Sequence, residues 1–294
     1  MKSKHIISLL NKLNKLNEKD ILEKESLPHC SNIMHQLGKE ILDETFYTEL
    51  LKHYFEIRKV KLNLQNVDEE DKVLKEFIYE LVEKTNLYYT FVSSMNISHQ
   101  SDFKSSIIPE MLCIILQTFL HVNNSNLKVS AQRDLIIECT YDLNNGDVIV
   151  FKNKKVDVAV FDEFDFKFGD NVNLKFPIPF WAIECKTNLD KNMLSGIQFS
   201  SQEFKKTFPR SKYFVITEFT DFDSNANYAD SDIDEIYCLR NQKRNEYRNN
   251  KSIPNSLNAD LVYEIALIFW RELQQKDNFL DTIKNRMLTG KLIG

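Results

Sequence analysis

Two acidic residues and one lysine stand inside apolar segments of the sequence. Asp157 lies in KKVDVAVF, and Glu184 and Lys186 follow 27 and 29 residues later in FWAIECKTNLDKNM. Both segments have the β-branched and aromatic content of strands, and the interior of a strand rarely holds a charged side chain. Three ionisable groups in such places predict a functional site.

The periodicity of a strand predicts which of these side chains meet. Residues two apart share a face, so Glu184 and Lys186 are expected on the same side as Ala182. The residues between them, Trp181, Ile183 and Cys185, are expected to pack on the other side. Two carboxylates and one ammonium group would then converge.

Carboxylates in this arrangement suit a hard metal ion. Mg²⁺ prefers oxygen ligands and is commonly held by one or two carboxylates together with substrate phosphate. Lys186 would stand beside a water molecule on that ion. The structural alternative is an ion pair that joins two strands, but the cost of desolvating a buried ion pair offsets much of its attraction. The D…ExK pattern alone is short and also occurs by chance.

The wider context of these residues resembles a known family. The segments SDFKSSIIPEMLCIIL (101–116), KKVDVAVF (154–161) and AIECKTNLDKNM (182–193), in this order and spacing, resemble the PD-(D/E)xK nuclease superfamily and, more narrowly, type II restriction endonucleases. ECKTNLDKNM is most similar to the enzymes that cut CCTNAGC-type sites, some of which work as two different subunits. The resemblance covers roughly residues 100–270, and Val156 stands where the motif has proline.

This resemblance implies a fold and a set of roles. The fold is an α/β (α+β) restriction-endonuclease-like core in the order αβββαβ, a mixed central sheet flanked by helices. Asp157, Glu184 and the main-chain carbonyl of Cys185 would hold Mg²⁺, while Lys186 would orient or deprotonate the attacking water. Glu110 would be a helix-borne acid that reaches the metal site. Its alternative role is a carboxylate that complements the helix dipole in a first turn.

Hydrophobic periodicity predicts the elements around these segments. Helices are expected within 3–62, with a break at Pro28, and within 67–89 and 104–122, where Ser105 or Ser106 can cap. Strands are expected at 127–141, 147–161, 178–186 and 212–219 and in DEIYCLR, with helices at 193–207 and from Asn258 onward. Residues 1–100 would form a helical N-terminal region and 101–294 the nuclease domain.

Basic residues near the end of the chain predict DNA contacts. LRNQKRNEYRNNK (239–251) is the strongest basic concentration, and its Lys243, Arg244 and Arg248 could bind phosphates or base edges. Arg133 and Lys191 are weaker candidates. A charged surface loop is the alternative for all of them. The acidic residues between Glu218 and Glu235 are interpreted as a solvated loop.

Composition excludes several other classes. The net charge of −5 argues mildly against a DNA binder that ignores sequence. Five cysteines without a CxxC pair indicate neither a disulfide framework nor a zinc ribbon, and fit a reducing cytoplasm. The six histidines have no metal-binding spacing, and no phosphate-binding glycine motif is present. No signal-like segment or membrane span is expected.

We therefore expect a Mg²⁺-dependent, site-specific type II endonuclease of double-stranded DNA. The alternatives are a repair or recombination nuclease with the same motif, and a non-catalytic DNA-binding subunit of a nuclease assembly. Cutting both strands favours two sites. A symmetric homodimer would suit a palindromic target, and a heterodimer with a second nuclease subunit an asymmetric one.

Overall fold

The computed structural model describes residues 4–19, 26–39, 44–64, 69–94, 102–142, 148–168, 172–221, 231–246 and 254–288. The N-terminal part of this chain is helical, as predicted. Pro28 opens a helix, where its missing N–H removes no intrahelical hydrogen bond. The helices are α1 (Lys4–Lys19), α2 (Pro28–Lys39), α3 (Glu44–Lys59), α4 (Glu70–Ser93), α5 (Asp102–Ser105) and α6 (Ile107–Val122).

A five-stranded mixed sheet follows α6. Its strand order is β1-β2-β3-β4-β5. The pairs β1–β2 and β2–β3 are antiparallel. Helix α7 returns the chain so that β4 runs parallel to β3, and β5 is in turn parallel to β4. This confirms the αβββαβ order. The elements are β1 (Lys128–Asp142), β2 (Val148–Phe168), β3 (Val172–Leu189), α7 (Lys191–Thr207), β4 (Lys212–Thr220), β5 (Glu235–Cys238) and α9 (Ala259–Leu288).

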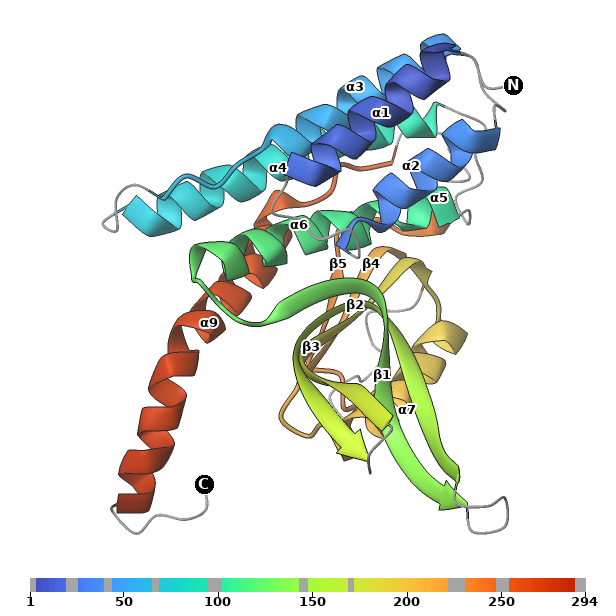
Figure 1. The fold of residues 1–294 in the computed structure, drawn as a ribbon. Helices are drawn as coiled ribbons and strands as arrows, with labels where there is room; N and C mark the ends of the chain where they lie inside the picture. The colour runs from blue at the N-terminus through green and yellow to red at the C-terminus, as the bar shows by residue number, and fades with distance from the viewer. Residues whose placement is uncertain are drawn as a thin grey trace.

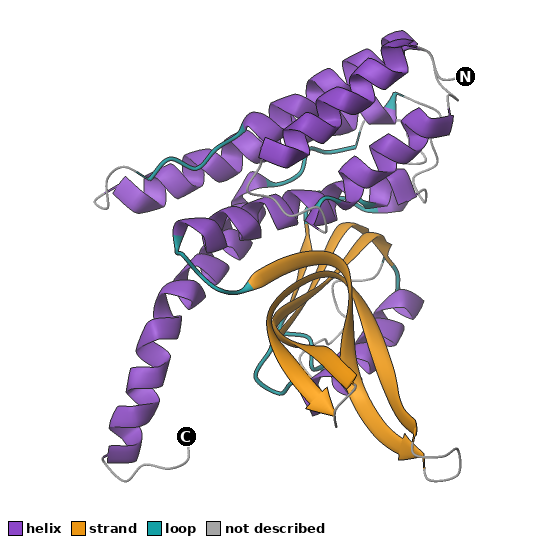
Figure 2. Ribbon diagram, in the orientation of Figure 1, coloured by secondary structure: helices purple, strands orange, loops and turns teal. Residues whose placement is uncertain are grey.

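The sheet carries an apolar cluster on each face. Figures 1 and 2 show α1 to α6 stacked above the sheet, with α7 beside it and α9 running down the other side. Trp181 and Ile183 of β3 belong to the cluster under the helices, and Ala182 belongs to the cluster around α7. The predicted alternation along β3 is therefore confirmed at these positions.

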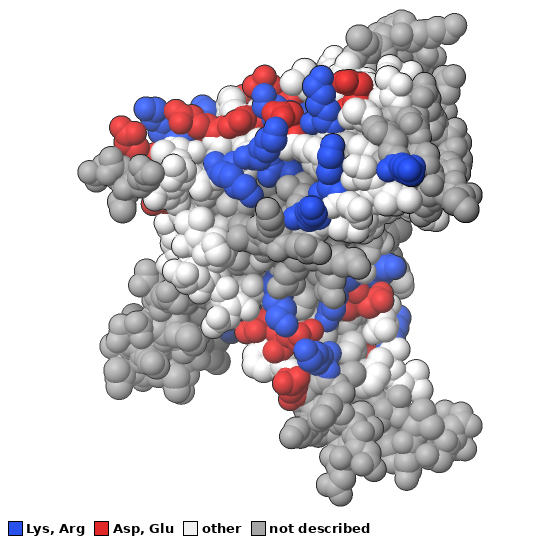
Figure 3. Space-filling model, turned by 45° about the horizontal axis from the view of Figure 1, so that its top comes forward, with Lys and Arg blue, Asp and Glu red and all other residues white. Residues whose placement is uncertain are grey.

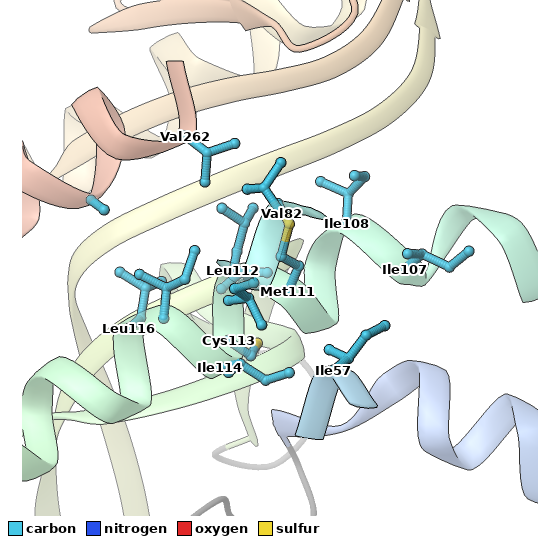
Figure 4. Close-up of a cluster of buried hydrophobic side chains, with 14 of the residues drawn as sticks. Ile57, Val82, Ile107, Ile108, Met111, Leu112, Cys113, Ile114, Leu116 and Val262 are labelled. Atoms are coloured by element: carbon cyan, nitrogen blue, oxygen red, sulfur yellow. The ribbon is translucent and has the colours of Figure 1, made fainter. Parts of the chain in front are cut away.

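Helix α6 lies at the centre of the helical half. Ile107, Met111 and Ile114 are buried, and side chains from α3, α4 and α9 surround the helix (Figure 4). The stretch Phe103–Val122 is long and apolar enough to cross a membrane, but 78% of its most apolar window is buried in the fold, as for a core helix. Ser106 precedes α6 without capping it, because its hydroxyl donates to the Phe103 carbonyl oxygen.

One apolar cluster joins the N-terminal helices to the rest of the molecule. It runs from Leu9 in α1 through α6 and the sheet to Leu273 in α9. Helix α9 packs along α4, where the Trp270 indole donates to Glu70 and Tyr79 donates to Asp260. Residues before and after position 100 thus share a hydrophobic core.

Candidate active site

Strands β2 and β3 separate beside Asp157. Their pairing runs up the hairpin as far as Val158 opposite Ile183. One residue further, the Asp157 side chain replaces the backbone ladder, since its Oδ2 accepts a 2.8 Å hydrogen bond from the Cys185 main-chain N–H. On its other edge β3 remains paired with β4, where Lys186 lies opposite Thr217. The carboxylate therefore lies where the two strands diverge.

Lys186 connects the two predicted carboxylates. Its ammonium nitrogen lies 3.3 Å from Asp157 Oδ2 and 3.0 Å from Glu184 Oε2. Glu184 is only 4% exposed, whereas Asp157 and Lys186 are half-buried. The three residues selected from the sequence are thus brought together in one cluster.

Two further residues hold Glu184. The Lys154 ammonium lies 2.6 Å from Glu184 Oε1, and the Tyr213 hydroxyl donates to the same oxygen at 3.0 Å. Neither was selected from the sequence. Tyr213 begins the buried part of β4 and lies opposite Ala182 in the parallel pairing, a neighbour that only the sheet register defines.

Lys154 was missed because the alternation of β2 breaks at Asp157. Val156 packs in the cluster around α7, but Val158 packs in the cluster under the helices, although residues two apart normally share a face. Regular alternation would place Lys155 beside Asp157. The break instead turns Lys154 toward Glu184.

Gln132 of β1 is another contact that the sequence did not indicate. Its side-chain amide donates to Asp157 Oδ1 at 2.9 Å. Asp157 consequently accepts hydrogen bonds at both oxygens, from β1 at one and from β3 at the other. The carboxylate is held between three strands.

The charges in the cluster stabilise one another. Burial by itself would raise the pKa of Glu184, but Lys186 and Lys154 outweigh it and lower that pKa. Burial by itself would lower the pKa of Lys186, but Glu184 and Asp157 raise it above the usual lysine value. Burial and Glu184 raise the pKa of Tyr213. At neutral pH the cluster therefore contains a charged Glu184, a charged Lys186 and a neutral Tyr213.

The donor set fits a hard divalent cation. Asp157 and Glu184 supply carboxylate oxygens, and the carbonyl of Cys185 belongs to the residue between Glu184 and Lys186. Across the described residues, no three His, Cys, Asp or Glu side chains gather as metal ligands. Two carboxylates are what Mg²⁺ uses when substrate and water complete its shell, whereas zinc sites use three or four protein ligands.

Glu110 does not lie in this cluster. Its Oε2 accepts from the Cys30 main-chain N–H at 2.8 Å, and its Oε1 accepts from the Tyr54 hydroxyl at 2.6 Å. Glu110 is buried in the first turn of α6, where its partners come from α2 and α3. Glu110 thus stands in a first helical turn, as in the alternative weighed from the sequence, and its hydrogen bonds join α6 to α2 and α3.

The candidate DNA contacts occupy different settings. Arg133 is partly buried, bonds to Glu163 at 2.9 Å and stacks on Phe161. Lys191 is exposed at the start of α7. Lys243 is exposed and Arg244 half-buried, while Arg248 lies outside the described residues.

Arg240 and Glu218 differ from the sequence interpretation. Arg240 was counted in the basic segment and Glu218 in a solvated acidic loop, yet both are buried and form a 2.9 Å ion pair. Tyr89 of α4 donates to Glu218 and lies under the Arg240 guanidinium. This ion pair connects the end of the sheet to α4, and the buried Arg240 guanidinium cannot contact DNA.

Surface charge is mixed on the face shown in Figure 3. Lys and Arg lie close to Asp and Glu over both the helical half and the sheet. Helix α3 also carries the exposed ion pairs Lys52–Glu49 and Lys59–Glu56. This distribution agrees with the slightly acidic composition.

The chain is similar in sequence and structure to known restriction endonucleases. A family profile described as Bpu10I restriction endonuclease matches residues 140–256, a range that contains Asp157, Glu184 and Lys186. A solved structure described as the native BbvCI A2B2 tetramer at low resolution is 27% identical, with a TM-score of 0.62. The match covers 86% of this chain and 98% of that chain. A comparison with curated proteins returned no match.

Proposed function

We propose that this chain, a type II restriction endonuclease, hydrolyses double-stranded DNA at a PD-(D/E)xK site with the help of Mg²⁺. Asp157, Glu184 and the main-chain carbonyl of Cys185 would hold the ion. The observation that carries the proposal is the position of Lys186, whose ammonium group bonds to both carboxylates where β2 and β3 separate.

The residues of the cluster would have different roles in hydrolysis. Bound Mg²⁺ would make a water ligand more acidic and offset negative charge on the phosphate. Lys186 brings a fixed positive charge to the place where negative charge develops during attack. Tyr213 and Lys154 hold Glu184, and the Cys185 N–H holds Asp157, so the ligands are oriented before substrate arrives.

Two exposed lysines near this cluster are the best candidates to hold the DNA backbone. Leu189 lies opposite Thr220, and Thr220 forms a bridge with Lys243. Adjacent strands lie about 4.8 Å apart, so Lys243 is on the order of 10 Å from Leu189. Lys191 follows Leu189 by two residues. Both lysines therefore lie near the carboxyl ends of β3 and β4, beyond Lys186. Arg133, Arg244 and Arg248 are further candidates.

Assembly with a second subunit completes the proposal. The similar solved structure is described as an A2B2 tetramer, which contains two kinds of chain. The present chain has one cluster of this type among its described residues, and one cluster cuts one strand at a time. We propose that a second nuclease subunit provides the site for the other strand, with a homodimer as the alternative.

Digestion of phage DNA tests the proposed function. With Mg²⁺, the purified chain, supplied with its partner subunit if it has one, should give discrete fragments whose sequenced ends share one motif. With Ca²⁺, which needs more ligands and a looser geometry, DNA should be bound but not cut. A smear of random ends would contradict site specificity, and equal cleavage with chelator present would contradict the need for a metal ion.

A further inference from the structure

The β1–β2 ladder is interrupted at one residue beside the candidate active site. Ala131 pairs with Val158 and Arg133 pairs with Val156, but Gln132 between them has φ 53°. This left-handed conformation is uncommon for residues other than glycine, asparagine and aspartate. Backbone strain of this kind persists only where surrounding structure imposes it, and it occurs often at functional sites.

The unusual backbone places the Gln132 side chain on Asp157. Its Nε2 donates to Oδ1 at 2.9 Å, while Oδ2 accepts from the Cys185 N–H at 2.8 Å. The Cys185 N–H and the Lys186 ammonium, which lies 3.3 Å away, both contact Oδ2 and leave Oδ1 without either of them. Gln132 fixes the second oxygen and therefore sets the plane of the carboxylate.

Gln132 also lies at the boundary with solvent. Its side chain is exposed and lines an open groove of about 510 Å³ together with Arg133, Asn153 and Lys175. An exposed glutamine at a DNA-cutting site could instead contact DNA. The two roles differ in one respect, since a DNA contact has no effect on the protein when DNA is absent.

We propose that Gln132 is a positioning residue, which holds the Asp157 carboxylate in the orientation needed to bind the divalent cation. This inference rests on the proposed function and deepens it. Groups that orient a metal ligand typically contribute about 10- to 100-fold in metal affinity or activity. We expect an effect of this size from Gln132.

The test replaces the side chain and keeps the backbone. Gln132→Gly removes the amide, and glycine adopts positive φ without strain. Asn124→Gly is the matched control, because Asn124 has φ 48° in the turn after α6 and its N–H bonds to the His121 carbonyl oxygen. Binding of Mn²⁺ to the DNA-free protein is followed by the paramagnetic resonance signal of the free ion. Melting temperatures are measured in parallel, as is cleavage of phage DNA with Mg²⁺ and with the partner subunit if the chain has one.

Gln132→Gly is expected to melt close to the wild-type temperature, bind Mn²⁺ about 10- to 100-fold more weakly and cut DNA more slowly by a similar factor. Asn124→Gly should match wild type in all three. If Gln132→Gly binds Mn²⁺ like wild type, the positioning role is wrong, and slower cleavage would then indicate a DNA contact. If wild type neither binds Mn²⁺ nor cuts DNA, the proposed function fails and this inference fails with it.

Discussion

Glu184 has three hydrogen-bonding partners for its two oxygens: Lys154, Lys186 and Tyr213. The positive charge of Lys154 lies next to the Glu184 carboxylate, which is almost fully buried. Replacing Lys154 with methionine keeps most of the aliphatic stem and removes the ammonium group. Glu184 then loses one of the two cations that lower its pKa.

Lys154→Met should therefore be less stable than wild type at neutral pH in the absence of divalent ions. A carboxyl group whose folded pKa is lowered stabilises the fold above its unfolded pKa of about 4.3 and loses this contribution as pH falls through the folded value. The difference between the two proteins should shrink below about pH 4. Urea unfolding across pH measures it, with exposed Lys155→Met as the control. An equal loss in both variants would contradict the role of Lys154.

At this scale the sequence predicts the three central groups but not those that support them. Asp157, Glu184 and Lys186 are recognisable because charge is unusual inside apolar strands. Lys154 and Gln132 depend on a break in strand alternation, and Tyr213 depends on parallel register. None of these features leaves a periodic signal in the residues themselves.

At the scale of the elements, the segment after β5 contains a buried basic residue and an exposed one. Arg240 is buried against Glu218, whereas Lys243 is exposed two strands from the end of β3. Arg240→Ala leaves a buried carboxylate unpaired and should cost about 3–5 kcal/mol of unfolding free energy. Lys243→Ala should change stability by less than about 0.5 kcal/mol.

Lys243→Ala, which should hardly change stability, should weaken DNA binding. Lys243→Ala should reduce the slope of log affinity against log salt by about one unit, as expected for a lost phosphate contact. The measurements are urea unfolding and fluorescence anisotropy with labelled DNA in Ca²⁺ over a range of salt. An unchanged slope in Lys243→Ala would show that Lys243 makes no phosphate contact and is an ordinary surface residue.

Element order was predictable because hydrophobic periodicity depends on local sequence. The strands at 127–141 and 212–219 and the helix at 193–207 agree with β1, β4 and α7 to within a few residues. Glu218 was interpreted wrongly although a signal existed, since it shares the phase of Phe214 and Ile216, which face the helices. Its burial requires a cation from a separate segment, and periodicity cannot supply that partner.

For the whole molecule, the open question is the source of the second active site. A nicking assay on supercoiled plasmid that carries the recognition sequence distinguishes the two assemblies. We expect the chain alone to nick or to remain inactive, and to linearise plasmid only when a second subunit is added. Linearisation in one encounter by a chain that sediments as a dimer would contradict the heteromeric assembly.

The roles of Asp157, Glu184 and Lys186 are tested most directly by single-turnover double-strand cleavage of phage DNA, with the partner subunit present if the chain has one. Alanine at any of the three should lower the cleavage rate by more than about 100-fold, beyond the range of residues that only support a metal ligand. All three variants should remain folded at the assay temperature with DNA affinity in Ca²⁺ near wild type, and Lys155→Ala should cut normally. Full cleavage by Asp157→Ala at saturating Mg²⁺ would contradict these roles.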